Sequence, residues 1–274
     1  MKTGMKKPMT VLVVGATGSI GRLVVDAAIR QGHAVRALVR DPAKASRFAR
    51  GAQVIVGDVT RPDTLSDAVE GVDAVVFTLG SDGAGKVRAE RIDYGGVRNV
   101  LRALGARTAR IALMTAIGVT NRTGAYNRAT EAHDWKRRSE RLVRASGLPY
   151  TIVRPGWFDS NGPDEHRLVL LQGDRRQEAG DPSDGVVARR QIAEVLVRSL
   201  TSEHALRKTF ELVAAAGPAQ DDLDPLFVPL EADQGTLDGV HDMANMALAD
   251  EPQRVRDDLQ TVLAQHAGSL SIAI

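Results

Sequence analysis

The chain has 274 residues, of which 43% are hydrophobic and 26% are charged. This composition is ordinary for a globular protein and provides enough apolar material for one large domain or two small ones. The absence of cysteine excludes disulfides, thiolate catalysis and Cys-ligated zinc. No apolar run approaches the roughly 18–20 residues needed to cross a bilayer, and the six histidines show no metal-ligand spacing. We therefore expect a cytoplasmic protein without a metal, with residues 1–8 as a short basic tail.

The charges are divided unevenly along the chain. The net charge of +2 is too small to suggest a nucleic acid partner. Residues 221–258 contain eleven acidic and two basic residues, a net charge of −9, so the rest of the chain carries +11 within the total of +2. A basic main body suits a phosphate-rich ligand, and it equally suits an acidic extension folded back over it.

Strand-like and helix-like segments alternate from the start of the chain. We expect strands at 10–14, 33–39, 53–56, 72–78, 110–114 and 150–153, and helices at 19–30, 63–70, 88–104 and 130–145. Strands that alternate with helices of this length indicate a parallel sheet with helices on both faces, and right-handed crossovers make it doubly wound. The fold class predicted from this pattern is therefore α/β with a doubly wound parallel sheet.

The alternation lapses after Arg154. Residues 173–185 are polar and rich in Gly and Asp and predict a loop, followed by a helix at 190–200 and a late strand at 209–213. A final helix opens at Pro252 and carries Val255, Leu259, Val262 and Leu263 on one face, which we expect to pack on the domain or on a second copy of the chain. The predicted divisions are a basic tail at 1–8, a nucleotide-binding domain at 9–218 whose substrate-side elements lie within 154–218, and an acidic C-terminal extension at 219–274.

A glycine-rich turn, Gly15–Gly21, follows the first strand and opens the first helix. This is the context that a dinucleotide-binding fingerprint requires. Gly15 allows a tight turn, Gly18 lets the backbone approach a pyrophosphate, and Gly21 allows close packing of helix on strand. The helix N-terminus adds free N–H groups and the positive end of its dipole. The turn therefore predicts dinucleotide binding, although such turns also serve as plain connections.

The end of the second strand indicates which dinucleotide is bound. An acid there holds the ribose 2′-OH of NAD, whereas an arginine accommodates the 2′-phosphate of NADP. The chain places Arg40 at this point, followed by Asp41 and Pro42. Asp41 could be the NAD-type acid, but an Asp cap with Pro at the first helical position explains it better. We predict NADP(H).

These residues, together with other short segments, resemble a known family. The chain is similar to the atypical short-chain dehydrogenase/reductases, in the NAD(P)-binding branch related to NmrA-like proteins and NADH-flavin or biliverdin reductases. The resemblance covers about residues 9–215 and implies a Rossmann fold with a small C-terminal substrate-side region. The segments that carry it, in family order, are Gly15–Gly21, Leu38–Arg40, Gly57–Val59, Met114–Val119, Lys136 with Glu140, and Thr151–Gly156.

The resemblance also implies where the cofactor lies. Asp58 and Val59 border the adenine, with turn or cap formation as the plain alternative for Asp58. Leu79 and Gly80 lie beside the adenosine ribose and pyrophosphate. The remaining cofactor-binding residues are Thr17, Ser19 and Ile20 in the turn and Pro155, Gly156, Trp157 and Phe158 at the nicotinamide. Trp157 and Phe158 could wall a planar substrate or simply pack in the core.

The chemistry is less complete than the cofactor site. Family members that reduce carbonyls carry a Tyr four residues before a Lys, on one helix face. Lys136 is present, but Ala132 stands in the place of the Tyr. Lys136 could instead be a surface residue paired with Glu140. Thr115 occupies the place of the family's Ser or Thr, and could equally be an ordinary hydroxyl at a strand end.

Two residues could replace the missing acid. His133 lies three positions before Lys136 and titrates near neutrality, and Tyr126 is expected in a polar loop before the helix. His133 could also be an ordinary solvent-exposed residue. Thr115, Lys136 and His133 are the catalytic candidates.

Three functions fit these residues. The first is an NADPH-dependent reductase whose small, planar, apolar acceptor, such as a flavin or quinone, needs no strong protein acid. The second is a non-catalytic NADP(H)-binding module that reports redox state to a partner, contacted through the acidic extension. The third is an isomerase or carbonyl reductase with a replacement acid. No nucleic acid or membrane partner is expected, and a homodimer through the extension remains open.

Overall fold

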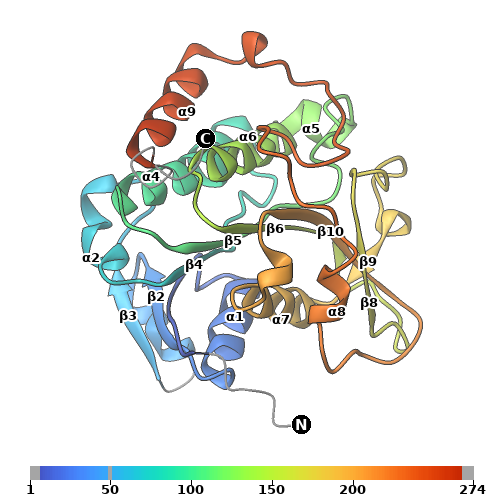
Figure 1. Ribbon diagram of the computed structural model, residues 1–274, viewed down its shortest axis with the longest axis horizontal. Coiled ribbons are helices and arrows are strands. Elements are labelled where there is room, and N and C mark those ends of the chain that lie inside the picture. Colours follow the sequence, from blue (N-terminus) through green and yellow to red (C-terminus); the bar gives the residue numbers. More distant parts are fainter. Residues whose placement is uncertain (1–6, 49–50, 267–274) are drawn as a thin grey trace.

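The strands assemble into one mostly parallel sheet in the computed structural model, which describes residues 7–48 and 51–266 (Figure 1). Its order is β3-β2-β1-β4-β5-β6-β10-β9-β7, with β8 paired to β10. The pairs from β3 to β10 are parallel, whereas β8 and β9 run antiparallel to β10. The chain therefore adopts the expected doubly wound Rossmann fold. The strands are β1 (Thr10–Val14), β2 (Ala34–Val39), β3 (Ala52–Val56), β4 (Ala74–Phe77), β5 (Arg110–Met114), β6 (Tyr150–Pro155), β7 (Trp157–Phe158), β8 (Arg167–Leu171), β9 (Val186–Val187) and β10 (Lys208–Ala215).

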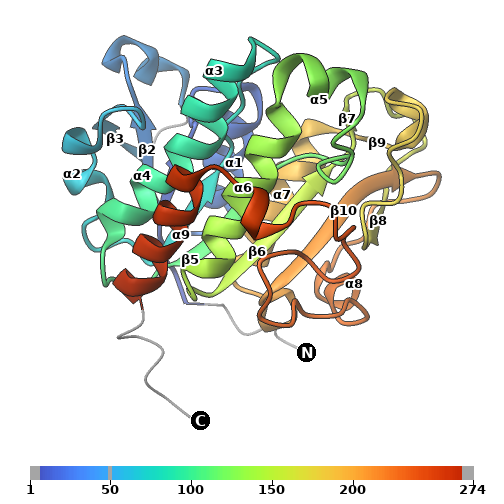
Figure 2. The ribbon, with the colours of Figure 1, turned by 90° about the horizontal axis from the view of Figure 1, so that it is seen from above.

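Helices cover both faces of the sheet (Figures 1 and 2). Helices α1 (Ser19–Arg30) and α7 (Arg189–Ser199) lie against one face. Helices α4 (Gly95–Leu104), α6 (Ala132–Ala145) and α9 (Gln253–His266) lie against the other. Strand β1 contributes Val11 and Val13 to the core between the sheet and helices α1 and α7. It contributes Leu12 and Val14 to the core between the sheet and helices α4, α6 and α9. This sharing explains its continuous apolar sequence, because successive side chains of a strand point to opposite faces.

Three predicted helices are more broken than their periodicity suggests. The segment expected at 88–104 consists of α3 (Lys86–Arg88), a π-helical stretch at Ala89–Tyr94 and then α4. The segment expected at 63–70 divides into a 3₁₀ turn at Pro62–Thr64 and α2 (Ser66–Val69). The helix expected at 130–145 begins as α5 (Ala125–Thr130) and restarts as α6, because Glu131 adopts a left-handed conformation with φ 53°. Tyr126 therefore lies on α5, and the expectation of a loop there was wrong.

The part of the chain after β6 completes the sheet. The late strand expected at 209–213 is β10, which pairs in parallel with β6. The antiparallel strand β8 and the short strands β7 and β9 were not predicted from the sequence. Residues 172–185 form the expected loop, which contains a 3₁₀ turn at Pro182–Asp184. Further 3₁₀ turns lie at Pro42–Arg47, Glu203–Ala205 and Leu248–Asp250.

The acidic extension folds back over α6. The extension includes the short helix α8 (Asp224–Phe227). Carboxylates that follow α8 form ion pairs with an arginine-rich face of α6. The ion pairs are Arg137 and Arg141 with Asp238, Arg138 with Glu251, and Arg144 with Asp233. Thus the uneven charge along the sequence largely reflects intramolecular pairing, the second of the two interpretations weighed above.

The last helix packs on the domain. Val255, Leu259 and Val262 of α9 are buried in the core formed with α4 and α6, whereas Leu263 is 46% exposed. Asp258 of α9 also accepts a hydrogen bond from Tyr94 and pairs with Arg102. The apolar stripe is therefore covered by the same chain. Within the described ranges, no helix combines the length and apolar character needed to span a membrane.

Candidate functional site

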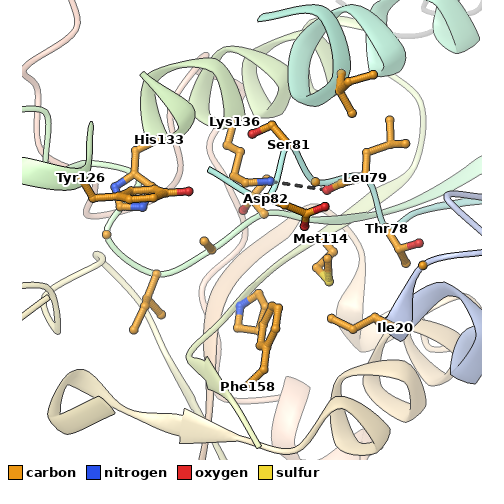
Figure 3. A pocket seen from close by; sticks show the side chains of 18 of the residues that line it. Ile20, Thr78, Leu79, Ser81, Asp82, Met114, Tyr126, His133, Lys136 and Phe158 are labelled. Atoms are coloured by element: carbon orange, nitrogen blue, oxygen red, sulfur yellow. Dashed lines mark hydrogen bonds between the residues drawn. The ribbon is translucent and has the colours of Figure 1, made fainter. Parts of the chain in front are cut away.

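A cavity of about 1070 Å³ opens at the carboxyl ends of strands β1 to β6 (Figure 3). This is the edge at which doubly wound sheets bind ligands. Its walls combine the glycine-rich turn, the ends of these strands, α6 and the loop before β9. The structure therefore brings together all but one of the candidate residues named above: Gly15, Thr17, Gly18, Ser19, Ile20, Arg40, Asp58, Val59, Leu79, Gly80, Thr115, His133, Lys136, Pro155, Gly156, Trp157 and Phe158.

Gly21, the exception, lies beneath the turn. A Cβ on Gly21 would overlap the carbonyl oxygen of Gly15, so the residue permits close packing rather than ligand contact. Gly15 itself has φ +87°, and a Cβ there would stand 2.9 Å from the carbonyl oxygen of Thr78 on the neighbouring strand end. The N–H of Gly18 donates to Gly15 at 2.9 Å. The turn thus presents the N-terminus of α1, with its unpaired N–H groups, to the cavity.

The two residues after β2 have different surroundings. Arg40 is exposed and lines the cavity. The carboxylate of Asp41 accepts the N–H of Ala43 at 3.0 Å, where a 3₁₀ turn begins at Pro42. Asp41 therefore has the capping geometry that its sequence context favours.

Asp58 follows β3 and faces the same end of the cavity. Its Oδ1 accepts both the backbone N–H of Thr60 at 2.8 Å and the Thr60 hydroxyl at 2.9 Å. Burial opposes ionisation of this carboxyl, but the two hydrogen bonds and the charges of Arg40 and Arg91 together hold its pKa below the usual value. Asp58 is therefore both a turn residue and an ionised acceptor on the cavity wall.

Lys136 reaches the cavity from α6 (Figure 3). Its Nζ lies 3.0 Å from Oδ1 of Asp93 and 3.4 Å from the carbonyl oxygen of Leu79. Asp93 belongs to the π-helical stretch and is buried. The alternative that Lys136 is a surface residue paired with Glu140 is wrong, because Glu140 is engaged with Arg154 and Arg144 instead.

Thr115 is linked to a buried ion cluster. Its hydroxyl donates to Oε1 of Glu140 at 2.7 Å. Glu140 in turn accepts from Arg154 at 3.0 and 2.7 Å. Burial alone would raise the pKa of Glu140, but the guanidinium groups of Arg154 and Arg144 and the Thr115 hydroxyl lower it to about 2. The Thr115 hydroxyl therefore donates its hydrogen bond to Glu140, a carboxylate that is ionised at pH 7.

His133 and Tyr126 lie together at one end of the cavity (Figure 3). Their ring centroids are 5.1 Å apart at an interplanar angle of 55°. Burial and the charge of Lys136 lower the pKa of His133 to about 4, so the imidazole is neutral at pH 7. The side chain is half-buried, in contrast to the plain expectation of an exposed histidine. Tyr126 is 49% exposed.

The aromatic residues after β6 form part of the wall. Trp157 is 43% exposed and lines the cavity with Phe158, so neither is a simple core residue. The guanidinium of Arg189 lies 5.2 Å from the Phe158 ring centroid, and its Nε donates to the hydroxyl of Ser19 at 3.1 Å. Arg189 joins the aromatic wall to the glycine-rich turn. Nothing in its local sequence marks this role, because its partners lie far away along the chain.

The loop before β9 supplies lining residues that sequence reasoning missed. Residues 176–180 border the cavity. The loop is fixed by buried Asp174, whose carboxylate accepts the N–H groups of Gly118 at 2.6 Å and Thr120 at 2.7 Å. A polar loop without a motif gives no signal of this contact.

Comparisons with known proteins agree with this geometry. The profile of the NAD(P)H-binding family matches residues 15–203. The chain is 29% identical to the photosystem II assembly factor Ycf39 of Synechocystis over 76% of this chain, and it spans 63% of that protein's length. It is 26% identical to sanguinarine reductase of Eschscholzia californica over 81% of this chain and 96% of that protein.

A solved structure has the same architecture. A putative NAD-dependent epimerase/dehydratase from Bacillus halodurans superposes with a TM-score of 0.66 at 25% identity, over 81% of this chain and all of that one. The profile match covers more than half of the chain and includes the glycine-rich turn, strands β2 to β6 and most of the cavity wall. The chain belongs to the NAD(P)H-binding family.

Proposed function

We propose that the protein is an NADPH-dependent reductase that transfers hydride to a planar conjugated ring, such as a flavin or quinone. The observation that carries the proposal is a cavity whose lining includes both the glycine-rich turn with Arg40 and the aromatic side chains of Trp157 and Phe158. Its volume of about 1070 Å³ is slightly above the range of roughly 300–1,000 Å³ typical of ligand sites. This size suits a dinucleotide with a second ring beside it.

Arg40 supports NADPH as the cofactor. The side chain stands at the end of β2, lines the cavity and is not held by Asp41, whose carboxylate caps the next turn. A guanidinium binds a phosphate group with several charge-assisted hydrogen bonds. We expect Arg40→Gln to weaken NADPH binding and to leave NADH binding unchanged.

The acceptor class is supported by the residues at the family's catalytic positions, where no side chain takes the place of the proton-donating Tyr. Ala132 stands where carbonyl-reducing relatives carry Tyr, His133 is neutral at pH 7, and the Thr115 hydroxyl donates its hydrogen bond to Glu140. Lys136 is held by Asp93 and by the carbonyl group of Leu79, close to where a nicotinamide ribose would lie. When bound, NADPH supplies the hydride. The side chains hold and align the two rings, and solvent protonates the product.

Steady-state oxidation of NADPH with a panel of flavins and quinones tests this proposal. We expect turnover with at least one planar acceptor and none with simple ketones. Loss of turnover in Trp157→Ala, with NADPH binding retained, would place the acceptor against the aromatic wall. Background rates with every acceptor would contradict a reductase.

A second candidate is a non-catalytic NADP(H)-binding protein that acts on a partner. It is favoured by the missing Tyr at position 132 and by the similarity to an assembly factor. Because the acidic extension is engaged with α6 of the same chain, a partner would have to contact another surface or displace it. Tight dinucleotide binding without hydride transfer to any acceptor would favour this function over the first.

A further inference from the structure

An exposed arginine of the loop before β9 lines the cavity near Trp157. Of the other lysine and arginine side chains that line the cavity, Lys136 is paired with Asp93, and Arg40 stands at the end of β2 where a 2′-phosphate would lie. Arg88 of α3 is exposed and, like Arg176, forms no hydrogen bond or ion pair within the described residues. Arg176 also lines the cavity and is exposed, yet it makes no hydrogen bond or ion pair with any residue in 7–48 or 51–266. Neither the fold nor the proposed cofactor site accounts for this guanidinium.

The backbone on either side of Arg176 is held firmly. Asp174 binds the N–H groups of Gly118 and Thr120. On the other side, the carbonyl oxygen of Gln177 accepts from Asn121 at 3.0 Å, and the Gln177 amide donates to the Thr120 hydroxyl at 3.0 Å. The loop thus fixes the position from which Arg176 extends, which reduces the entropic cost of binding a ligand there.

The guanidinium lies next to the aromatic wall. Its Nη1 is 4.0 Å from the point where a Cβ on Gly185 would stand. The carbonyl oxygen of Gly185 accepts the N–H of Trp157 at 2.8 Å, and the Gly185 backbone abuts Gly156. Arg176 is therefore placed beside the backbone that carries Trp157.

Two carboxylates share this part of the lining. Asp184 is engaged with the N–H groups of Ala179 at 3.0 Å and Gly180 at 2.6 Å. Glu178 lines the cavity but forms no ion pair with Arg176 in the described part of the chain. A guanidinium offers five donors to an anion. The geometry points to an acceptor whose planar ring carries an anionic substituent, a carboxylate or a phosphate, bound by Arg176. This inference rests on the proposed reductase function and names its substrate class.

Riboflavin and FMN give a matched pair of probes, since they share one ring and differ by a phosphate. With the full chain and NADPH, each accepts one hydride and one solvent proton and leaves NADP⁺ and the reduced flavin. We expect kcat/KM to be about tenfold higher for FMN, as one charge-assisted contact at an exposed site allows. Arg176→Gln should remove this preference while keeping riboflavin turnover. Arg175→Gln, an exposed neighbour outside the lining, should keep the preference.

Binding separates this inference from the reductase proposal. Quenching of flavin fluorescence in the presence of NADP⁺ should show tighter binding of FMN than of riboflavin, and the difference should vanish in Arg176→Gln. Inorganic phosphate at millimolar concentration should not abolish the preference if ring and anion bind together. Equal binding of the two flavins, a preference kept in Arg176→Gln, or weaker NADPH binding by that variant would overturn the inference. If neither flavin is reduced, the reductase proposal fails, and the binding measurement still decides the role of Arg176.

Discussion

Replacement of Asp242 by asparagine removes a buried carboxylate from the guanidinium of Arg154. The two carboxylate oxygens of Asp242 each lie 2.7 Å from a guanidinium nitrogen, and both side chains are almost fully buried. Breaking a buried ion pair by removing one partner costs roughly 3–5 kcal/mol. Arg154 retains Glu140, and the asparagine oxygen can still accept one bond. We therefore expect Asp242→Asn to lower the free energy of unfolding by about 2–4 kcal/mol.

Urea unfolding, followed by tryptophan fluorescence, measures this loss. At about 2–4 °C per kcal/mol for a chain of this size, the midpoint of thermal unfolding should fall by roughly 5–15 °C. Asp238→Asn is the matched control in the same extension. Asp238 is more exposed, and its partners Arg137 and Arg141 keep the carbonyl groups of Met243 and Met246. We expect that control to cost less than Asp242→Asn, because the Asp238 side chain is 28% exposed, although both of its arginine partners are buried.

The comparison between the two variants is what tests the reasoning. If Asp242→Asn unfolds like the wild type, the extension is not held to β6 by a buried ion pair. If Asp238→Asn lowers the free energy of unfolding as much as Asp242→Asn does, the burial of the Arg154 cluster does not determine the size of the loss. Either result would contradict the account of how the extension is fixed to the domain.

Three further predictions concern the site and its ion cluster. Gly21→Ala should weaken NADPH binding more than tenfold, because the added Cβ would overlap the Gly15 carbonyl oxygen. Gly32→Ala lies outside the cavity lining and should change stability but not the Kd for NADPH measured by calorimetry. Glu211 has its pKa raised to about 8, mainly by burial. Between the ordinary pKa of a glutamate and pH 8, Glu211 is therefore protonated in the folded state and ionised in the unfolded state. Its contribution to the free energy of unfolding falls as pH rises across that window. The unfolding free energy of Glu211→Gln minus that of the wild type should become more positive from pH 5.5 to 7.5, by up to about 1.4 kcal/mol per pH unit, and a constant difference would refute the protonated state. His133→Phe should change kcat by less than about threefold, and the wild-type profile should show no His133 titration between pH 6 and 8, since its pKa is about 4; a bell centred near neutrality that disappears in the variant would instead assign the acid to His133.

The central sheet and the turn could be predicted because their signals are local. Strands β1 to β6 are short segments rich in apolar residues. The glycine spacing has a steric reason, and the structure shows it at Gly15 and Gly21, where a Cβ would overlap backbone atoms. Helix existence was predictable, but helix continuity was not. The left-handed residue Glu131 that separates α5 from α6 leaves no trace in the hydrophobic periodicity.

The ion cluster could not be predicted because its members are far apart along the chain. Arg154 meets Glu140, 14 positions away, and Asp242, 88 positions away. No periodicity links such residues. The charge division of the sequence did indicate that the acidic extension could fold over a basic surface, and α6 is that surface.

The substrate side of the cavity was only partly predictable. Trp157 and Phe158 follow a family segment, so the resemblance located them. Arg176 lies in a segment with no motif, and it reaches the cavity because the neighbouring Asp174 binds the N–H groups of Gly118 and Thr120, more than 50 positions away. Arg189 likewise contacts Ser19, 170 positions away. Tertiary contacts of this kind are absent from a single sequence.

Calorimetric titration of the wild-type protein with NADPH and with NADH tests the central claim most directly. We predict a single site with a Kd on the order of micromolar for NADPH, and binding of NADH at least about tenfold weaker, because only NADPH offers a phosphate to Arg40. No heat with NADPH at millimolar concentration would contradict the assignment of the cavity as a dinucleotide site. Equal affinity for the two cofactors would contradict the role of Arg40.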